Sequence, residues 1–152
     1  MEAYIVDAVR TPVGRRGGGL SGVHPADLGG AALDALMSRT GIDPAAVEDV
    51  IFGCVDTVGP QAGDIARTAW LAAGLPDHVP GTTVDRQCGS SQQAVHFAAQ
   101  AVVSGTADVA RPAVYRGVLN CFAAVMTDSQ VGALRDDIDV DYLSEDARVA
   151  LD

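Results

Sequence analysis

The sequence predicts a single α/β domain in which helices cover a sheet. Over the first 110 residues, short β-branched runs alternate with longer stretches whose apolar residues recur at helical spacing. Such alternation is typical of crossover connections in a layered α/β fold. The length of 152 residues suits one domain, and a hydrophobic content of 48% with 20% charged residues is sufficient for a core.

Three strands are expected, over residues 3–9, 50–55 and 81–85. The first two are nearly continuous apolar runs, which is typical of strands that are covered on both faces. Cys54 falls inside the second run and is expected to pack in the core there. The third strand leads directly into a helix, so a turn between strand and helix is expected around Cys88.

Three helices are expected between and after these strands. The first begins near Pro25, and its inner face is predicted to carry Leu28, Ala31, Ala32, Ala35 and Leu36. The second covers residues 62–73, ends at Gly74 and Pro76, and is predicted to turn inward Ile65, Thr68, Ala69, Ala72 and Ala73. The third covers residues 88–103 and is apolar on almost every side, which predicts burial on every side.

Composition excludes several classes of function. The net charge is −10, and all ten basic residues are arginine, so chemistry that needs a lysine amine is excluded. An acidic chain without a basic stripe argues against nucleic acid as a partner. No apolar run is long enough for a membrane span, and the N-terminus has no features of a signal peptide. Three widely spaced cysteines, Cys54, Cys88 and Cys121, indicate reduced thiols and a cytoplasmic protein.

Cys88 is the strongest candidate for catalysis. It stands between a strand and a helix, where free backbone N–H groups and the positive end of the helix dipole favour a thiolate. Gly89 and the serines after it are expected to allow close approach of a substrate, so an acyl-accepting nucleophile is one interpretation. The alternative, which the local pattern supports equally, is a small buried hydrophobic residue.

The other candidates are weaker. His24 and His78 precede prolines in loops, and His96 lies about two helical turns, roughly 12 Å, beyond Cys88, so none is well placed as a base. The glycine-rich residues 14–22 lack the patterns of phosphate-binding loops and are interpreted as a mobile loop. Cys121, like Cys54, is expected to be a core residue. The acidic C-terminal stretch lacks metal-binding spacing, so no metal site is expected.

Several segments together resemble one family. Residues 8–14 (Ala-Val-Arg-Thr-Pro-Val-Gly), residues 53–55 (Gly-Cys-Val) and residues 84–94, which contain Cys88, are similar to the motifs of thiolases, the acetyl-CoA acyltransferases and acetyltransferases. The resemblance covers about residues 1–109, the N-terminal part of the family pattern. It implies the N-terminal half of a βαβαβαββ thiolase-type fold, with a mixed sheet and a buried helix that bears the nucleophile, here incomplete.

The resemblance also implies a chemistry. Cys88 would hold an acyl group as a thioester during transfer to or from coenzyme A, and its backbone N–H would form part of an oxyanion hole. The substrates would be coenzyme A thioesters of fatty-acid or lipid metabolism, with no bound cofactor. A homodimer or homotetramer would be expected. Acyl chain length and the direction of the reaction are not implied.

Two departures bear on activity. The family's activating histidine lies in Gly-His-Pro, and its proton-transferring cysteine lies in Cys-x-Gly-Gly-Gly, and neither motif occurs in this sequence. Each such group contributes about 10²–10⁴-fold to rate, so this chain alone is expected to be weak or inactive. The alternatives are a non-catalytic module that binds an intact thiolase-like subunit, and a remnant without function.

Residues 110–152 depart from the α/β pattern and are expected to be poorly ordered. Where the family has Gly-Gly-Val, this chain has Pro-Ala-Val-Tyr at residues 112–115. The codons CCG GCG GTG TAC encode these four residues, and the frame one nucleotide earlier reads Gly-Gly-Val. A frameshifted tail is therefore one hypothesis, and a genuinely divergent tail is the other.

Overall fold

The computed structural model describes residues 3–106, 114–116 and 123–124. In chain order the elements are α1 (Pro25–Thr40), β1 (Asp49–Gly53), α2 (Ile65–Ala72), β2 (Gly81–Val84), α3 (Ser90–Ser104), β3 (Val114–Arg116) and β4 (Ala123–Ala124). Single turns of 3₁₀-helix precede β1 at Pro44–Ala46 and α2 at Gly59–Gln61. The predicted alternation of helix and strand is therefore confirmed.

The sheet is mixed, as predicted, with the strand order β2-β1-β3-β4. β1 pairs in parallel with β2, from Val50 opposite Gly81 to Gly53 opposite Val84. β1 also pairs in parallel with β3, whereas β3 and β4 are antiparallel. Because β1 and β2 run parallel, their carboxyl ends lie at the same edge of the sheet.

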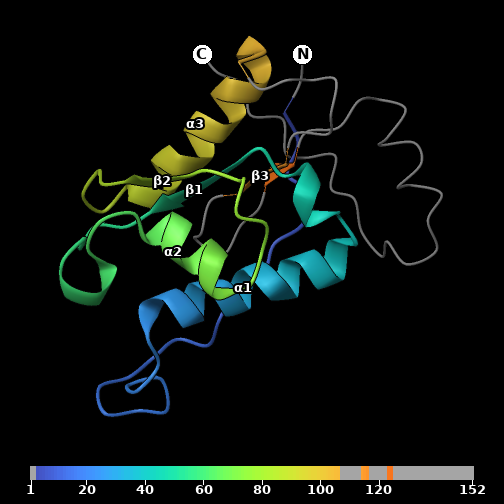
Figure 1. Ribbon diagram of the computed structural model, residues 1–152. Helices are drawn as coiled ribbons and strands as arrows, with labels where there is room; N and C mark the ends of the chain where they lie inside the picture. The colour runs from blue at the N-terminus through green and yellow to red at the C-terminus, as the bar shows by residue number, and fades with distance from the viewer. Residues whose placement is uncertain (1–2, 107–113, 117–122, 125–152) are drawn as a thin grey trace.

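Helices lie on both faces of the sheet (Figure 1). On one face α1 and α2 form the larger core, which includes Leu33, Leu36, Val50, Phe52 and Trp70. On the other face α3 packs against Ile51 through a row of small and medium side chains, Ala94, Ala98 and Val102. Successive residues of β1 thus alternate between the two cores, as the pleat of a strand requires.

The predicted inner faces of α1 and α2 are wrong in part. In α1 the buried residues are Ala26, Gly30, Leu33, Leu36 and Met37, whereas Ala31 and Ala35 are exposed. In α2 the buried residues are Ile65, Ala66, Ala69 and Trp70, whereas Thr68 and Ala72 are exposed. The burial of large side chains yields more free energy than the burial of alanines, so Leu33, Met37 and Trp70 determine which way each helix turns.

The prediction that α3 is buried on every side is also wrong. Phe97 and Val103 are each 43% exposed, although both are apolar. The sheet covers only the side of α3 that carries Ala94, Ala98 and Val102. The apolar composition of the helix therefore exceeds what the described part of this chain covers.

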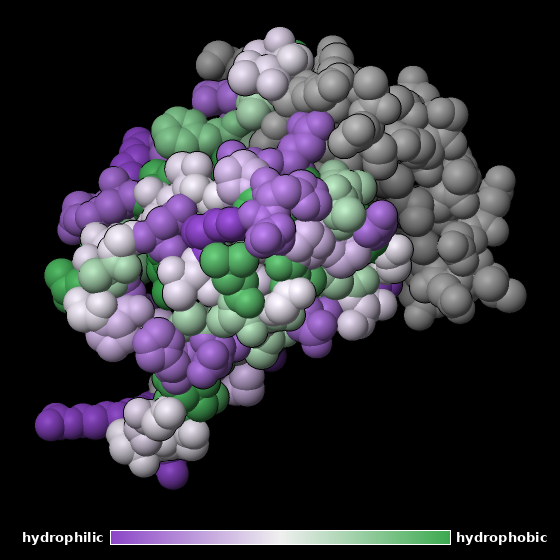
Figure 2. Space-filling model, viewed as in Figure 1, coloured by the Kyte–Doolittle hydropathy of each residue, from purple (hydrophilic) through white to green (hydrophobic). Residues whose placement is uncertain are grey.

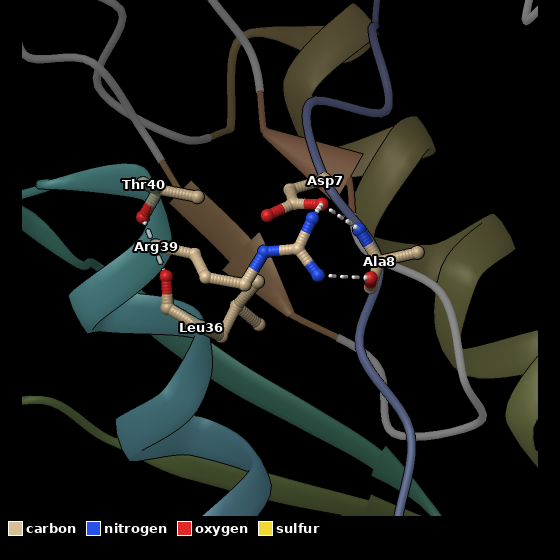
Figure 3. Close-up of polar contacts among 5 residues, drawn as sticks. All are labelled: Asp7, Ala8, Leu36, Arg39 and Thr40. Atoms are coloured by element: carbon tan, nitrogen blue, oxygen red, sulfur yellow. Dashed lines mark hydrogen bonds and ion pairs between the residues drawn. The ribbon is translucent and has the colours of Figure 1, made fainter. Parts of the chain in front are cut away.

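The expected first strand is not formed. Between residues 3 and 9 only Tyr4 makes an isolated β-bridge, and the rest of the segment is irregular. The Asp7 carboxylate accepts the Ala8 N–H at 2.7 Å and pairs with Arg39 at 3.0 Å, and Arg39 also donates to the Ala8 carbonyl at 3.4 Å (Figure 3). These side chains occupy both backbone groups of Ala8, which a strand ladder would otherwise use.

The segment is nevertheless fixed to the domain. Val6 and Val9 pack against the core beneath α1 and α2, and Ala3 packs against the core beneath α3. The contact with Arg39 holds the segment beside the last turn of α1, where Thr40 donates to the Leu36 carbonyl at 2.8 Å (Figure 3). The side chains of this segment are partly buried although its backbone does not join the sheet. That burial explains why the sequence of the segment is apolar and resembles that of a strand.

Most of residues 110–152 lies outside the described residues. The exceptions are β3 and β4, which extend the sheet beyond β1. The expected boundary near residue 109, the poor order of the tail and its frameshifted origin stay predictions. Across residues 3–106 and the two short strands, no helix has the length and apolar character that a membrane crossing requires.

Candidate active site

Cys88 lies in a short turn, residues 85–89, that joins β2 to α3. The helix begins at Ser90, two residues later than the sequence predicts, and Gly89 is its N-cap residue. Cys88 is a free, exposed thiol in this turn. The alternative in which Cys88 is a buried hydrophobic residue is therefore wrong for this chain.

The backbone of the turn is unusual at two successive residues. Gln87 and Cys88 have φ angles of 21° and 38°, and they are the residues other than glycine with positive φ in the described structure. For residues with a Cβ this region costs about 1–2 kcal/mol each. Strain of this kind persists only where surrounding contacts hold it, and it is found often at functional sites.

Side chains on both sides of Cys88 hold the turn. Before it, the Asp85 carboxylate accepts the backbone N–H of Gln87 at 3.2 Å and its side-chain amide at 2.9 Å. After it, the Ser90 hydroxyl accepts the Arg86 backbone N–H at 3.0 Å. The Arg86 guanidinium in turn donates to Gln93 in the first turn of α3 at 2.7 Å. The conformation at Cys88 is thus set by hydrogen bonds within residues 85–93.

The start of α3 is anchored to the sheet. A Cβ on Gly53, the last residue of β1, would lie 2.1 Å from the Ser91 backbone nitrogen, so only glycine permits this approach. The Ser91 hydroxyl donates to the Gly53 carbonyl at 3.3 Å, and the next residue, Cys54, donates its N–H to Val84 at 3.0 Å. The carboxyl ends of β1 and β2 therefore position the turn that carries Cys88.

The serines after Cys88 have a different role from the predicted one. Ser90 and Ser91 are 6% and 4% exposed and bind backbone groups, so they do not provide open space for a substrate. Sequence reasoning missed this bracing by Asp85, Ser90 and Gln93. The available signal was the run of short polar residues around the cysteine, since such side chains hydrogen-bond nearby backbone.

The helix start favours a negative charge beside Cys88. No side chain caps the N-terminus at Gly89, and the first turn of α3 contains no acidic residue. Backbone N–H groups at a helix N-terminus and the helix dipole attract anions. The arrangement can therefore stabilise a negatively charged oxygen that forms next to Cys88.

The three histidines do not form a dyad with Cys88 in the described contacts. The His24 ring accepts the Ala26 N–H at 3.2 Å and so caps α1. The His78 ring lies 3.2 Å from the Ala45 carbonyl. His96 is half-buried in the second turn of α3. Their assignment as poorly placed bases agrees with these positions.

The remaining candidates lie apart from the turn. Cys54 follows β1 and is half-buried, with its thiol 3.6 Å from the Asp56 carbonyl, so it is not the core residue expected. Cys121 lies outside the described residues. Residues 14–22 form a loop of successive turns before α1. This loop projects from the body of the molecule at the lower left, with hydrophilic side chains at its tip (Figures 1 and 2). Among the described residues no group of His, Cys, Asp or Glu side chains is arranged to hold a metal ion.

Comparison with known proteins identifies relatives of this fold. The sequence profile of the thiolase N-terminal domain matches residues 3–117. The chain is 69% identical over 108 residues to the steroid 3-ketoacyl-CoA thiolase FadA6 of Mycobacterium tuberculosis, which covers 71% of this chain and 26% of that protein. It is 46% identical over 109 residues to a β-ketoadipyl-CoA thiolase of Escherichia coli, with 71% and 27% covered.

A comparison with solved structures also identifies a relative. The chain superimposes on the crystal structure of a Bacillus anthracis acetyl-CoA acetyltransferase with a TM-score of 0.65 and 38% sequence identity. The match covers 76% of this chain and 28% of that one. The chain therefore spans about a quarter of the length of the relatives that it matches.

Proposed function

The chain belongs to the thiolase family, and from this premise we propose that Cys88 is an acyl-accepting nucleophile for coenzyme A thioesters. The observation that carries the proposal is the position of Cys88, exposed on a strained turn directly before the uncapped N-terminus of α3. An exposed thiolate beside such a helix end is a good nucleophile.

The proposed reaction has two steps. The Cys88 thiolate attacks the keto carbon of a 3-ketoacyl-CoA. The bond between that carbon and the carbon next to the thioester breaks, and the released acetyl-CoA carbanion takes up a proton. The thiol of a second coenzyme A then attacks the Cys88 thioester, so that acyl-CoA leaves and the thiolate is restored. The Cys88 backbone N–H and the amides of the first turn of α3 would stabilise the negative oxygen in each step.

We expect the two proton transfers of the reaction to limit turnover by this chain. Removal of a proton from coenzyme A and protonation of the leaving carbanion need a base and an acid, and the family motifs for both are missing from the sequence. We therefore expect acylation of Cys88 without efficient turnover.

Self-association belongs to the same proposal. Phe97 and Val103 on α3 are exposed although they are apolar, and burial of such surface favours association. The reduced state of Cys88 that the reaction needs would be maintained in the cytoplasm, where we place the chain. A chain that binds an intact thiolase-like subunit and forms no thioester is the second candidate, which the same exposed side chains favour.

Acylation of Cys88 provides the test. The purified 152-residue chain is incubated with acetyl-CoA or acetoacetyl-CoA at neutral pH and analysed by intact-mass and peptide mass spectrometry. We expect one acyl group on Cys88, its absence in Cys88→Ser, and thiolysis far below that of a full-length relative. An acyl group that persists in Cys88→Ser, or no acylation at all, would contradict the nucleophile, and co-purification of a larger thiolase without acylation would support the binding module.

A further inference from the structure

We propose that Ser90 is a positioning residue for Cys88, because its hydroxyl closes a ring around the strained turn. The Ser90 oxygen accepts the Arg86 N–H at 3.0 Å, and this bond encloses Gln87, Cys88 and Gly89. The inference rests on the proposed nucleophilic role of Cys88. It assigns to Ser90 the role of holding the Cys88 thiol next to the N-terminus of α3.

Both ends of the turn are fixed independently of this bond. Val84 is held in β2 opposite Gly53 and accepts the Cys54 N–H at 3.0 Å. Ser90 begins α3 and is 6% exposed, next to Ser91, whose backbone lies against Gly53. Only residues 85–89 are free to change conformation between these points, and the Ser90 hydroxyl reaches back into that interval.

Arg86 is the residue through which Ser90 acts. Its N–H donates to the Ser90 hydroxyl, its carbonyl accepts the Gly89 N–H at 3.1 Å, and its guanidinium donates to Gln93 at 2.7 Å. The positive φ angles at Gln87 and Cys88 lie inside this set of bonds. Without the hydroxyl, the Arg86 N–H loses its partner within the turn. The two bonds from Gln87 to the Asp85 carboxylate remain, so the restraint that weakens is mainly the one on the positive φ of Cys88.

Loss of the Ser90 hydroxyl should change the reactivity of Cys88, because that reactivity depends on how close the thiol lies to the N-terminus of α3. The N–H groups and the dipole of α3 act over about one turn, so displacement of the thiol weakens their effect on the thiolate. We expect Ser90→Ala to lower the rate of Cys88 alkylation by roughly threefold to tenfold, the size of such helix-end effects. This hydrogen bond is part-buried, so its loss should also lower the melting temperature modestly, and the rate of Cys54 separates that general effect from the effect on Cys88.

Alkylation by iodoacetamide tests the proposal within one molecule. The rates of Cys88 and Cys54 are measured together by peptide mass spectrometry in the unaltered chain, Ser90→Ala, Ser90→Thr and Ser104→Ala. Ser104 is the matched control, since its hydroxyl donates to the Ala101 carbonyl at the other end of α3. We expect a slower Cys88 with an unchanged Cys54 in Ser90→Ala only, and recovery in Ser90→Thr, which keeps the hydroxyl.

Each other result overturns the proposal. An unchanged Cys88 rate in Ser90→Ala shows that the hydroxyl does not position the thiol, and a rise at both cysteines shows that Ser90 only stabilises the fold. Failure of Ser90→Thr to recover the rate excludes the hydroxyl as the cause. In the unaltered chain the Arg86 amide must also exchange slowly with deuterium, and exchange at the rate of an unbonded amide overturns the proposal without any variant. Iodoacetamide needs no coenzyme A chemistry, so these results are independent of whether Cys88 is acylated.

Discussion

Gly53 and Ser91 meet backbone to backbone, where the last residue of β1 touches the first turn of α3. A Cβ built on Gly53 lies 2.1 Å from the Ser91 nitrogen and 2.3 Å from its Cα, closer than any real Cβ contact. The Ser91 hydroxyl donates to the Gly53 carbonyl across the same contact. The sheet thereby determines where α3 begins, and with it the position of Cys88.

Replacement of Gly53 by alanine is therefore expected to be severe. The atoms in the way belong to backbone and cannot rotate aside, so we expect a loss of about 3 kcal/mol or more in the free energy of unfolding, the upper end of overpacking effects. Urea denaturation measures the loss. Gly19→Ala is the control, since a Cβ there meets no atom within 4 Å, and equal effects of the two substitutions would contradict the close approach.

The N-cap of α2 is expected to act together with β2. The Asp64 carboxylate accepts the Arg67 N–H at 3.2 Å and the Thr83 hydroxyl at 2.7 Å, and that hydroxyl accepts the Ala66 N–H at 3.1 Å. We expect Asp64→Ala to cost about 1–2 kcal/mol. In a double-mutant cycle with Thr83→Val the two losses should not add, because the side chains share one network. Additive losses would contradict the coupling, and the exposed Thr82→Val serves as the control.

The thiols are expected to differ in reactivity. Cys88 is exposed beside a helix N-terminus, whereas Cys54 is half-buried with its thiol against the Asp56 carbonyl. Brief alkylation at neutral pH should therefore label Cys88 before Cys54 and before Cys121. Peptide mass spectrometry at several times gives the order. Faster labelling of either other cysteine would show that the turn does not present Cys88 as described.

Asp49 is expected to make stability depend on pH. Burial raises the pKa of this carboxyl, the Val50 N–H opposes the rise, and the negative charge of Asp64 adds to it. Since the folded chain binds this proton more tightly than the unfolded chain, the stabilisation is complete below the unfolded pKa of about 3.9 and is lost as pH rises through the folded pKa.

Asp49→Asn should consequently stabilise the chain at neutral pH. The gain should be no more than about 0.5 kcal/mol, as for a site outside the core, and should shrink in acid where the aspartate is protonated. Urea midpoints at neutral and acid pH measure it, with Asp34→Asn on the exposed side of α1 as the control for the loss of one charge. A gain that is the same at both pH values would contradict the role of ionisation.

The site divides into parts that local sequence predicts and parts that it does not. The turn between β2 and α3 and the position of Cys88 within it were predictable, because a strand run, a glycine and a helical stretch follow one another there. The bracing by Ser90 and the contact of Gly53 with Ser91 were not. The first depends on left-handed φ angles, and the second joins residues 38 positions apart.

By itself, the sequence determined the α/β alternation, the family and the candidate nucleophile, since each depends on periodicity or on a motif of neighbouring residues. Tertiary structure decided which sides of the helices are buried, because Leu33 and Trp70 compete with smaller apolar residues for the same sheet. It also decided that residues 3–9 form no strand in the described part of the chain, where Asp7 and Arg39 bind the backbone at Ala8 instead. Both outcomes depend on the free energy of contacts between distant segments, which local pattern does not contain.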